Sequence, residues 1–219
     1  MALRTLRLRL PPGGILRSGE AETARVEAFS DGVLAIVITL LVLDVKVPQQ
    51  VSGGNGALWH ALGQQVPMLG AWALSFFFVL VFWVAHHYLF AQLAHVDRGL
   101  LWLNGLFLFA ISFTPFPTAL LGLYPGLSAS AMLLSLAMFV TAGSFSLMRW
   151  YATRHAKLFR PEHAPHAAVA LWRSLLGPAL YLAAAVAAQI AIPVAVAIQI
   201  AVPLLFFLPA GKQAAEEEP

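Results

Sequence analysis

Hydroxyl and carboxylate side chains interrupt a long apolar stretch near the N-terminus of the chain. Residues 29–47 are almost wholly apolar, yet they include Ser30, Asp31, Thr39 and Asp44. A helix of this length, at about 1.5 Å per residue, reaches the roughly 30 Å of a bilayer core. Because a carboxylate at membrane depth is energetically expensive, it usually marks ion or proton movement or a buried pair. This stretch is therefore the first candidate for chemistry.

Helical geometry sorts the stretch into two faces. At about 100° per residue, one face combines branched apolar side chains with a single hydroxyl. That face carries Phe29, Gly32, Ile36, Thr39, Leu40 and Leu43. Asp31 and Ser30 fall on the other side, and Arg25 is poorly placed to pair with Asp31, so we expect Asp31 to find its partner on a neighbouring helix. From periodicity alone, the apolar face could simply pack within one subunit.

The composition is that of a membrane protein. Of the 219 residues, 60% are hydrophobic and only 11% are charged, whereas a soluble domain is about one-quarter charged. The mean hydropathy is +0.78. Cysteine is absent, which excludes disulfides and thiolate chemistry. The net charge is +3, and the basic residues are distributed along the chain as membrane topology requires. This charge therefore does not indicate nucleic-acid binding, and we expect no nucleic-acid partner.

Six hydrophobic blocks predict an all-α, polytopic membrane protein with six transmembrane helices. The blocks cover about residues 25–48, 58–93, 99–121, 127–151, 169–189 and 193–208. The glycine-rich run Ser52–Gly56 predicts a loop, and Pro67 predicts the start of the second membrane helix or a kink in it. We expect a basic cytoplasmic tail at 1–24, a six-helix transmembrane domain at 25–208 and an acidic disordered tail at 209–219.

The basic residues predict the orientation. With six spans both termini lie on one side of the membrane, and all of the 13 Lys and Arg residues except Lys46 belong to that side. The positive-inside rule then places both termini in the cytoplasm. Asp31 accordingly lies near the cytoplasmic end of the first helix, and His86 and His87 lie at the same depth on the second.

Several motifs resemble the transmembrane-protein-175 family, which comprises the lysosomal potassium channel and its bacterial relatives. The first-helix signature of that family matches Arg25-x-x-x-Phe29-Ser30-Asp31-Gly32, followed by Ala35-Ile36 and Thr39-Leu40-Leu41. The resemblance continues through Trp83-x-x-His86-His87, Asn104-x-x-Phe107-Leu108 and Pro117. It covers about residues 25–120 well, and the rest only in the number and length of the helices.

The resemblance implies a function and an assembly. In this family four copies of the first helix surround a central ion pathway, so we expect a homotetramer in the bacterial inner membrane that conducts cations passively and prefers potassium. The pore lining then comprises Phe29, Gly32 and the constriction residues Ile36, Leu40 and Leu43, with Thr39 as the selectivity hydroxyl. Its partners are the lipid bilayer and permeant potassium ions, and we expect no cofactor and no resident metal.

The types of these residues explain physically how such a constriction would work. Rings of branched side chains exclude water and close by dewetting or steric contact, and a ring of hydroxyls replaces part of an ion's hydration shell. Potassium is less strongly hydrated than sodium, so an apolar neck penalises sodium more. The chain lacks a TVGYG-like carbonyl filter, so we expect modest selectivity.

A second polar set has two interpretations, a structural network that holds the first helix or a gating latch. The set comprises Arg25, Ser30, Asp31, Trp83, His86, His87 and Asn104. In the family, the Trp-x-x-His-His element provides the partner of Asp31. A histidine beside a carboxylate would titrate in the physiological range, whereas a buried neutral histidine bonded to a carbonyl would not. Asn104 is expected to bridge helices.

The main alternative function is a proton-coupled transporter that uses Asp31 with His86 or His87 as a proton relay. Transporters usually show repeats and helices broken near the midplane, whereas the centre of the first helix is uninterrupted. An enzyme is not expected, because the sequence has no GxSxG, Walker, dinucleotide or cysteine-nucleophile motif and its histidines lack metal-ligand spacing.

Overall fold

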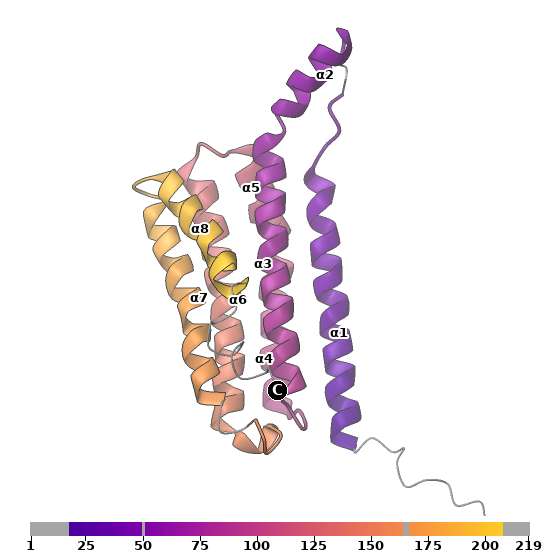
Figure 1. The fold of residues 1–219 in the computed structure, drawn as a ribbon, viewed down its shortest axis with the longest axis vertical. Coiled ribbons are helices and arrows are strands. Elements are labelled where there is room, and N and C mark those ends of the chain that lie inside the picture. The colour runs from indigo at the N-terminus through magenta and orange to yellow at the C-terminus, as the bar shows by residue number, and fades with distance from the viewer. Residues whose placement is uncertain (1–17, 50, 164–166, 208–219) are drawn as a thin grey trace, which may run out of the picture.

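The computed structural model describes residues 18–49, 51–163 and 167–207 as a bundle of helices (Figure 1). Within these ranges the only β-type pairing is one isolated bridge between Leu93 and Phe159. In chain order the helices are α1 (Ser18–Leu40), continued by the 3-10 turn η1 (Leu41–Asp44), α2 (Gly54–Gly63), α3 (Val66–Ala91), α4 (Arg98–Ser112), α5 (Pro115–Leu123), α6 (Ser128–Arg154), the 3-10 turn η2 (Ala156–Leu158), α7 (Ala167–Ala187) and α8 (Ile192–Phe207). The predicted all-α class is confirmed.

In the described part of the chain, four helical segments are long and apolar enough to cross a membrane. They are Ala21–Asp44, Val66–Ala91, Arg98–Leu123 and Ser128–Arg154. Helices α7 and α8 contribute shorter apolar stretches, Leu171–Ala187 and Ile192–Phe206. The protein is therefore a multi-pass membrane protein, and the total of six spans stays a prediction.

Glycine and proline set the boundaries of α2 and α3. Pro67 lies in the first turn of α3, as predicted. The loop predicted at Ser52–Gly56 is wrong beyond Gly53, because α2 begins at Gly54 and extends past the end of the bundle. Gly53 has a φ of 120°, which glycine adopts without strain, and this residue turns the chain into α2.

The boundaries expected for the two tails can be compared with the described residues only at the N-terminal side. Helix α1 begins at Ser18, upstream of the expected boundary at residue 25. The acidic tail expected at 209–219 lies outside the described residues. The boundaries of the three regions therefore stay predictions.

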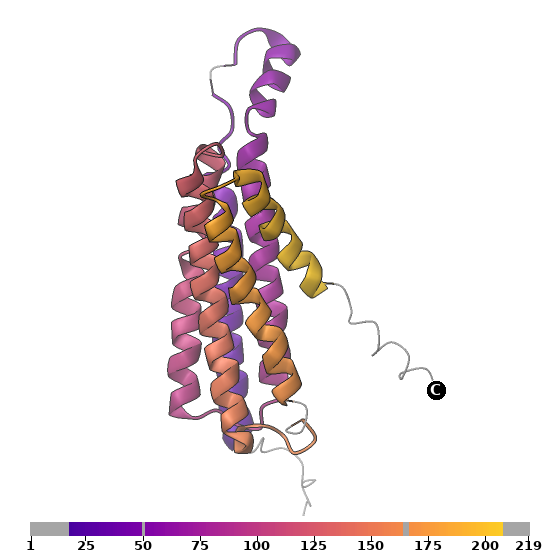
Figure 2. The same cartoon turned by 90° about the vertical axis from the view of Figure 1, so that its left-hand side faces the viewer.

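Aromatic side chains fill the centre of the bundle. Phe82 of α3 packs against Phe107 of α4 and Phe145 of α6, with ring centroids 5.9 and 6.3 Å apart. Helix α1 lies along one side of this core and contacts both α3 and α4. Helix α8 turns back beside α7 and ends part-way along the bundle (Figure 2).

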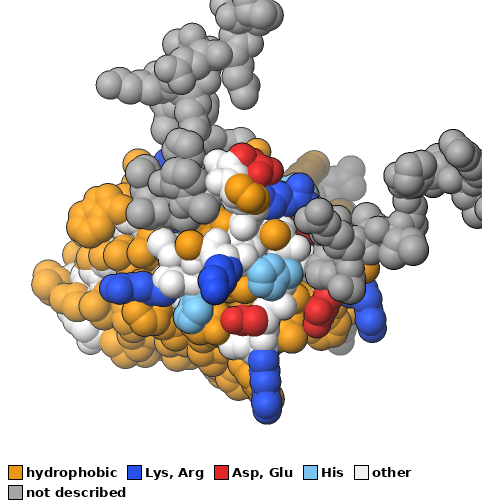
Figure 3. All heavy atoms as spheres, turned by 90° about the horizontal axis from the view of Figure 1, so that it is seen from below, with side chains coloured by type: hydrophobic (Ala, Val, Ile, Leu, Met, Phe, Trp, Pro, Cys, Tyr) orange, Lys and Arg blue, Asp and Glu red, His pale blue; other side chains and the backbone are white. Residues whose placement is uncertain are grey.

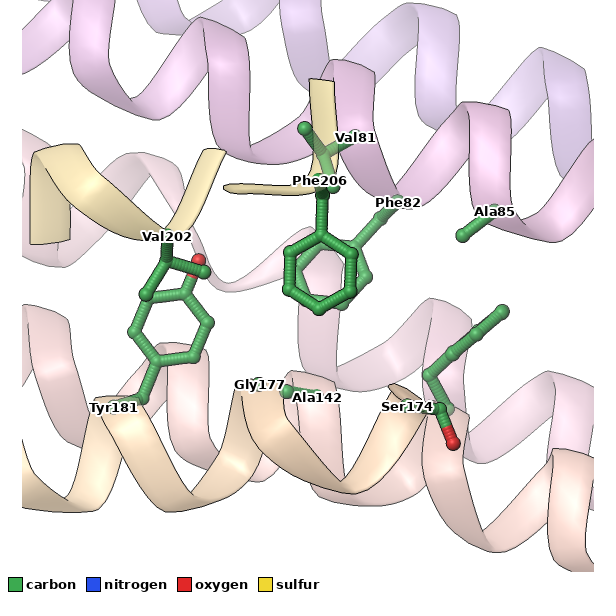
Figure 4. Close-up of a pocket in the computed structure, with 10 residues that line it drawn as sticks. Val81, Phe82, Ala85, Ala142, Ser174, Gly177, Tyr181, Val202 and Phe206 are labelled. Atoms are coloured by element: carbon green, nitrogen blue, oxygen red, sulfur yellow. The ribbon is translucent and has the colours of Figure 1, made fainter. Parts of the chain in front are cut away.

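A small apolar cavity of about 40 Å³ lies under the end of α8. Val202 and Phe206 of α8 border it, with Tyr181 of α7 and Phe82 of α3 facing them (Figure 4). All of its lining residues come from α3, α6, α7 and α8. The cavity is therefore separate from the apolar face of α1.

Charged and histidine side chains gather at one end of the bundle (Figure 3). There Asp97 caps α4, accepting hydrogen bonds from the Leu100 N–H at 2.8 Å and from the Tyr151 hydroxyl at 2.9 Å. Desolvation by itself would raise the pKa of Asp97, but these hydrogen bonds outweigh it and leave the pKa below its ordinary value. The carboxylate therefore stays ionised at neutral pH and ties α4 to α6.

Candidate functional site

The apolar face of α1 points away from the rest of the bundle. All six of its residues are exposed, with Ile36 at 59% and Leu43 at 61%. We call this face the α1 stripe; it consists of Phe29, Gly32, Ile36, Thr39 and Leu40 of α1, together with Leu43 of the η1 turn that continues the helix. The opposite side of the same helix is buried through Leu34 and Val37. None of the residues that the structure describes covers the stripe, so it does not pack within this part of the subunit and is open to lipid or to further subunits.

Thr39 provides the only hydroxyl of this stripe, and the residue is exposed. The hydroxyl donates its proton back to the helix, lying 3.0 Å from the Ala35 carbonyl and 2.9 Å from the Ile36 carbonyl. A hydroxyl whose proton is engaged in this way leaves its oxygen lone pairs free to accept or to coordinate. The arrangement suits contact with a cation better than contact with an anion.

Behind the stripe, a buried hydrogen-bonded chain joins three helices. Asn104 of α4 donates from Nδ2 to the Ser30 hydroxyl of α1 at 2.9 Å. Its Oδ1 lies 2.9 Å from Nε2 of His86 in α3. Because a carbonyl oxygen only accepts, His86 carries its proton on Nε2. All three side chains are at most 3% exposed, so this chain holds α1 against α3 and α4.

Two further contacts join α1 to α3 nearer the surface. The indole Nε1 of Trp83 donates to Oδ1 of Asp31 at 3.0 Å. Nδ1 of His87 lies 2.9 Å from Oε1 of Glu27. The rings of Trp83 and His87 stack with centroids 6.0 Å apart, so the two contacts form one seam. The expectation that Asp31 finds its partner on a neighbouring helix is confirmed.

The chain is similar in sequence to proteins that are named as potassium channels. Residues 25–115 match the family model described as endosomal/lysosomal potassium channel TMEM175. A potassium channel from Streptomyces collinus is 45% identical over 161 residues, which cover 71% of this chain and 77% of that protein. The chain belongs to the TMEM175 family. A potassium channel from Chamaesiphon minutus is 37% identical over 177 residues, covering 79% of this chain and 87% of that protein.

The fold also matches a solved TMEM175 structure. The crystal structure of a homolog from Chamaesiphon minutus, described as a lysosomal potassium-selective channel, superposes with a TM-score of 0.75 at 34% identity. The match covers 85% of this chain and 96% of that chain. TMEM175 proteins are ion channels rather than enzymes, so the resemblance read from the first-helix signature is confirmed at the level of the family. In the residues that the structure describes, no group of three or more His, Asp or Glu side chains is placed to hold a metal ion.

Six of the seven residues in the second polar set take part in contacts between helices of this TMEM175 chain. Asn104 bridges helices as expected, joining Ser30 to His86. Arg25 differs, because it is exposed and makes no ion pair with any described residue. The functional roles of these residues stay predictions, since contacts alone do not distinguish a structural network from a gating latch.

Glu27 is the contact residue that the sequence did not single out. Charges near helix ends are energetically cheap, so Glu27 carries no signal by itself. The signal lies in matched spacing: Glu27 and Asp31 are one helical turn apart on α1, and their partners His87 and Trp83 are one turn apart on α3. Two helices paired in antiparallel register bring such residues together.

Replacing Trp83 with phenylalanine should weaken the seam between α1 and α3. The change keeps the aromatic ring but removes the donor to Asp31, a loss of about 1 kcal/mol for a partly exposed hydrogen bond to a carboxylate. The melting temperature, Tm, of the purified protein should then fall by about 2–4 °C. Trp172→Phe on α7, an exposed tryptophan, is the matched control. An equal shift in both variants would show that the Asp31 contact contributes nothing specific.

Proposed function

We propose that this TMEM175 protein is a potassium-preferring cation channel, assembled as a homotetramer with α1 of each subunit facing a central pore. The α1 stripe carries the proposal, because it is exposed on a helix whose opposite side is fixed to α3 and α4. The names of the Streptomyces and Chamaesiphon relatives support potassium as the permeant ion. One protomer cannot enclose a pathway, so symmetry supplies the remaining walls.

In this proposal Ile36, Leu40 and Leu43 form apolar layers of the neck. The seven residue steps from Ile36 to Leu43 span only about 10 Å, so the dehydrated zone is short. Rings of branched side chains hold water out when the helices are close and admit it when they separate. The ring of Thr39 oxygens offers partial coordination beside the neck. The free-energy cost of dehydration there is smaller for potassium than for sodium, because potassium is less strongly hydrated.

The polar contacts behind α1 position the pore helix. Ser30, Asn104 and His86 form a fully buried chain, which favours a fixed spacing between α1 and its supports. The Asp31–Trp83 contact lies on the same half of α1 but is more exposed. We propose that the buried chain is the structural part of the network, and that the outer seam is the part able to rearrange when the pore opens.

For the topology we propose six spans, with α7 and α8 as the fifth and sixth. Residues 25–208 then form the six-helix transmembrane channel domain, and the tails at 1–24 and 209–219 lie in the cytoplasm of a bacterial cell. The asymmetry of Lys and Arg supports this orientation. The gathering of charged side chains at one end of the bundle also supports it.

A proton-coupled transporter is the less favoured function. A relay through Asp31 and His86 needs the two groups to exchange a proton directly or through a neighbour. In the structure Asp31 accepts from Trp83, whereas His86 bonds to Asn104, whose amide cannot relay a proton readily. His87 has a carboxylate partner, but that partner is Glu27 rather than Asp31.

Purified protein in liposomes separates the two functions. With a potassium gradient and no proton gradient, we expect potassium flux that sets the membrane voltage toward the potassium equilibrium potential. A coupled transporter would need a proton gradient and would shift the internal pH in step with potassium. Native mass spectrometry of the same preparation should give four subunits, and a monomer that conducts would overturn the shared-pore arrangement.

A further inference from the structure

Helix α6 carries a buried arginine that has no counter-charge among the described residues. Arg149 is only 8% exposed. Its Nε has no hydrogen-bond partner, and its side chain makes no ion pair with any described residue. Asp97, a carboxylate near the same end of the bundle, accepts from the Tyr151 hydroxyl instead. A cation buried in this way is energetically costly unless an anion pairs with it.

One aromatic ring separates this arginine from the apolar cavity under the end of α8. The guanidinium carbon of Arg149 lies 5.7 Å from the centre of the Phe145 ring, and Phe145 lines the cavity. This contact is favourable, but it does not replace the counter-ion of a buried charge. Ala142, which also lines the cavity, is seven residues before Arg149, so the two lie within about 20° of each other around α6. The charge and the cavity therefore share one face of the helix, about 10 Å apart along its axis.

The cavity lies beside the last described turn of α8. Helix α8 contacts α3, α6 and α7, and its last described residue, Phe207, is part-way along the bundle (Figure 2). Next to Phe206, on the side away from Val202, the lining includes two small residues, Ala85 of α3 and Ser174 of α7 (Figure 4). These side chains leave room between α3 and α7 for a thin group.

The size and the lining of the cavity suit the end of an acyl chain rather than water. The volume is about 40 Å³, whereas one water needs about 10–15 Å³, so there is room for about three groups of that size. Of the ten lining residues only Ser174 and Tyr181 carry a polar side-chain group. The Ser174 hydroxyl already donates to the Leu171 carbonyl at 2.7 Å. Water would therefore find few partners in the cavity, and an apolar chain would lose nothing by entering it.

The depth of Arg149 matches that of a lipid headgroup. Helix α6 has 27 residues and is about 40 Å long, so its ends extend beyond a hydrocarbon core of roughly 30 Å. Arg149 is five residues, or about 8 Å, before the end of α6 at Arg154. The cavity lies about 10 Å deeper, within the roughly 15 Å that one leaflet of the core provides. The charge and the cavity thus have the spacing of the headgroup and the tail of one lipid molecule.

We infer that Arg149 and the cavity under α8 bind one anionic phospholipid, with the phosphate on the guanidinium and an acyl chain in the cavity. Arginine pairs with phosphate through two parallel N–H···O hydrogen bonds, and basic pockets between membrane helices are typical sites for anionic headgroups. Helices α7 and α8 lie on the side of the bundle away from α1, where the proposed ring of subunits leaves them facing lipid (Figure 1). The site goes beyond the proposed function and does not depend on it, because a single protomer supplies every residue.

Thermal unfolding of the full-length protein tests the headgroup contact. In lipid-free detergent, Arg149→Gln removes an uncompensated charge, so its Tm should equal or exceed that of the wild type. Dioleoyl phosphatidylglycerol should raise the wild-type Tm by several degrees more than dioleoyl phosphatidylcholine does, and this difference should vanish in Arg149→Gln. Arg154→Gln, at an exposed arginine of the same helix, should keep it. No difference in the wild type, or the same response in all three proteins, would overturn the inference.

A side chain that fills the cavity tests the acyl-chain contact. Ala85→Leu should weaken the binding of dioleoyl phosphatidylglycerol several-fold in native mass spectrometry, whereas Ala183→Leu, at an exposed alanine of α7, should bind like the wild type. Inorganic phosphate at the same concentration should not reproduce the rise in Tm, because it has no chain. Equal lipid binding by both variants, or an equal rise in Tm with phosphate, would overturn the lipid site.

The acidic residues Glu216, Glu217 and Glu218 are a competing anion from this chain, outside the described residues. Glutamine at all three positions should leave the Tm and the response to phosphatidylglycerol unchanged. A fall in Tm that disappears when Arg149→Gln is combined with these changes would instead assign Arg149 to the acidic tail, and would overturn the inference. Potassium flux and subunit number are measured separately, so failure of the lipid site leaves the proposed function standing.

Discussion

Replacing Ile36 with asparagine should raise cation flux several-fold and bring the potassium-over-sodium preference close to unity. In the proposed tetramer the change introduces four amides into an apolar layer of the neck. Each amide can hold water, so the layer no longer excludes it, and an ion passes without losing its hydration shell. Sodium gains more than potassium, because dehydration costs it more.

Flux and reversal potential measured in liposomes with opposing potassium and sodium gradients test this prediction. Val42→Asn is the matched control, since Val42 is also an exposed branched residue near the end of α1 but lies off the α1 stripe. The control should conduct and select like the wild type. Should Ile36→Asn also leave both quantities unchanged, the α1 stripe would not line the pathway.

The residues that make up the apolar face of α1 could be predicted, because one helix contains the whole signal. Ile36, Leu40 and Leu43 recur with the helical period, and the buried Leu34 and Val37 occupy the complementary positions. The structure adds that this face is uncovered, which periodicity cannot show, since an apolar face looks the same whether it packs inside a subunit, on lipid or on another subunit.

Contacts between helices were harder to predict, because they depend on register. A polar residue in a membrane helix indicates a bridge, so Asn104 could be expected to join helices. Its partner Ser30 and the pairing of Glu27 with His87 follow only once the depth of each helix is fixed. A shift of one turn between α1 and α3 would instead have placed Asp31 opposite His87, or Glu27 opposite Trp83.

Helix α2 shows a different limit. The run around Gly54 has low helix propensity and was predicted as a loop, yet α2 begins there. None of the residues of α2 is buried within the described chain, so packing in the protomer does not account for the helix. The residues after Gly56, including Leu58 and Trp59, are favourable for a helix at a membrane surface. The helix that they form continues toward the N-terminus as far as Gly54.

Replacing Asn104 with alanine should destabilise the protein more than any other single change in the network. The substitution removes the acceptor for His86 Nε2–H and the donor to Ser30, and both groups lie in an apolar, fully buried setting. His86 is also stacked on Phe90 at 4.2 Å, so its ring is not free to turn toward another acceptor. We expect a loss of about 2–4 kcal/mol in the free energy of unfolding.

Thermal unfolding in detergent measures this loss, which corresponds to a fall of roughly 4–16 °C in Tm. Ser144→Ala is the matched control, because Ser144 is equally enclosed but donates only to the Thr141 carbonyl of its own helix. Adding Ser30→Ala to Asn104→Ala should cost little more than Asn104→Ala alone, since the contact between the two side chains is already lost. Full additivity of the two changes would instead mean that Ser30 and Asn104 act independently, and α1 would then have to be held mainly by apolar packing and by the outer seam.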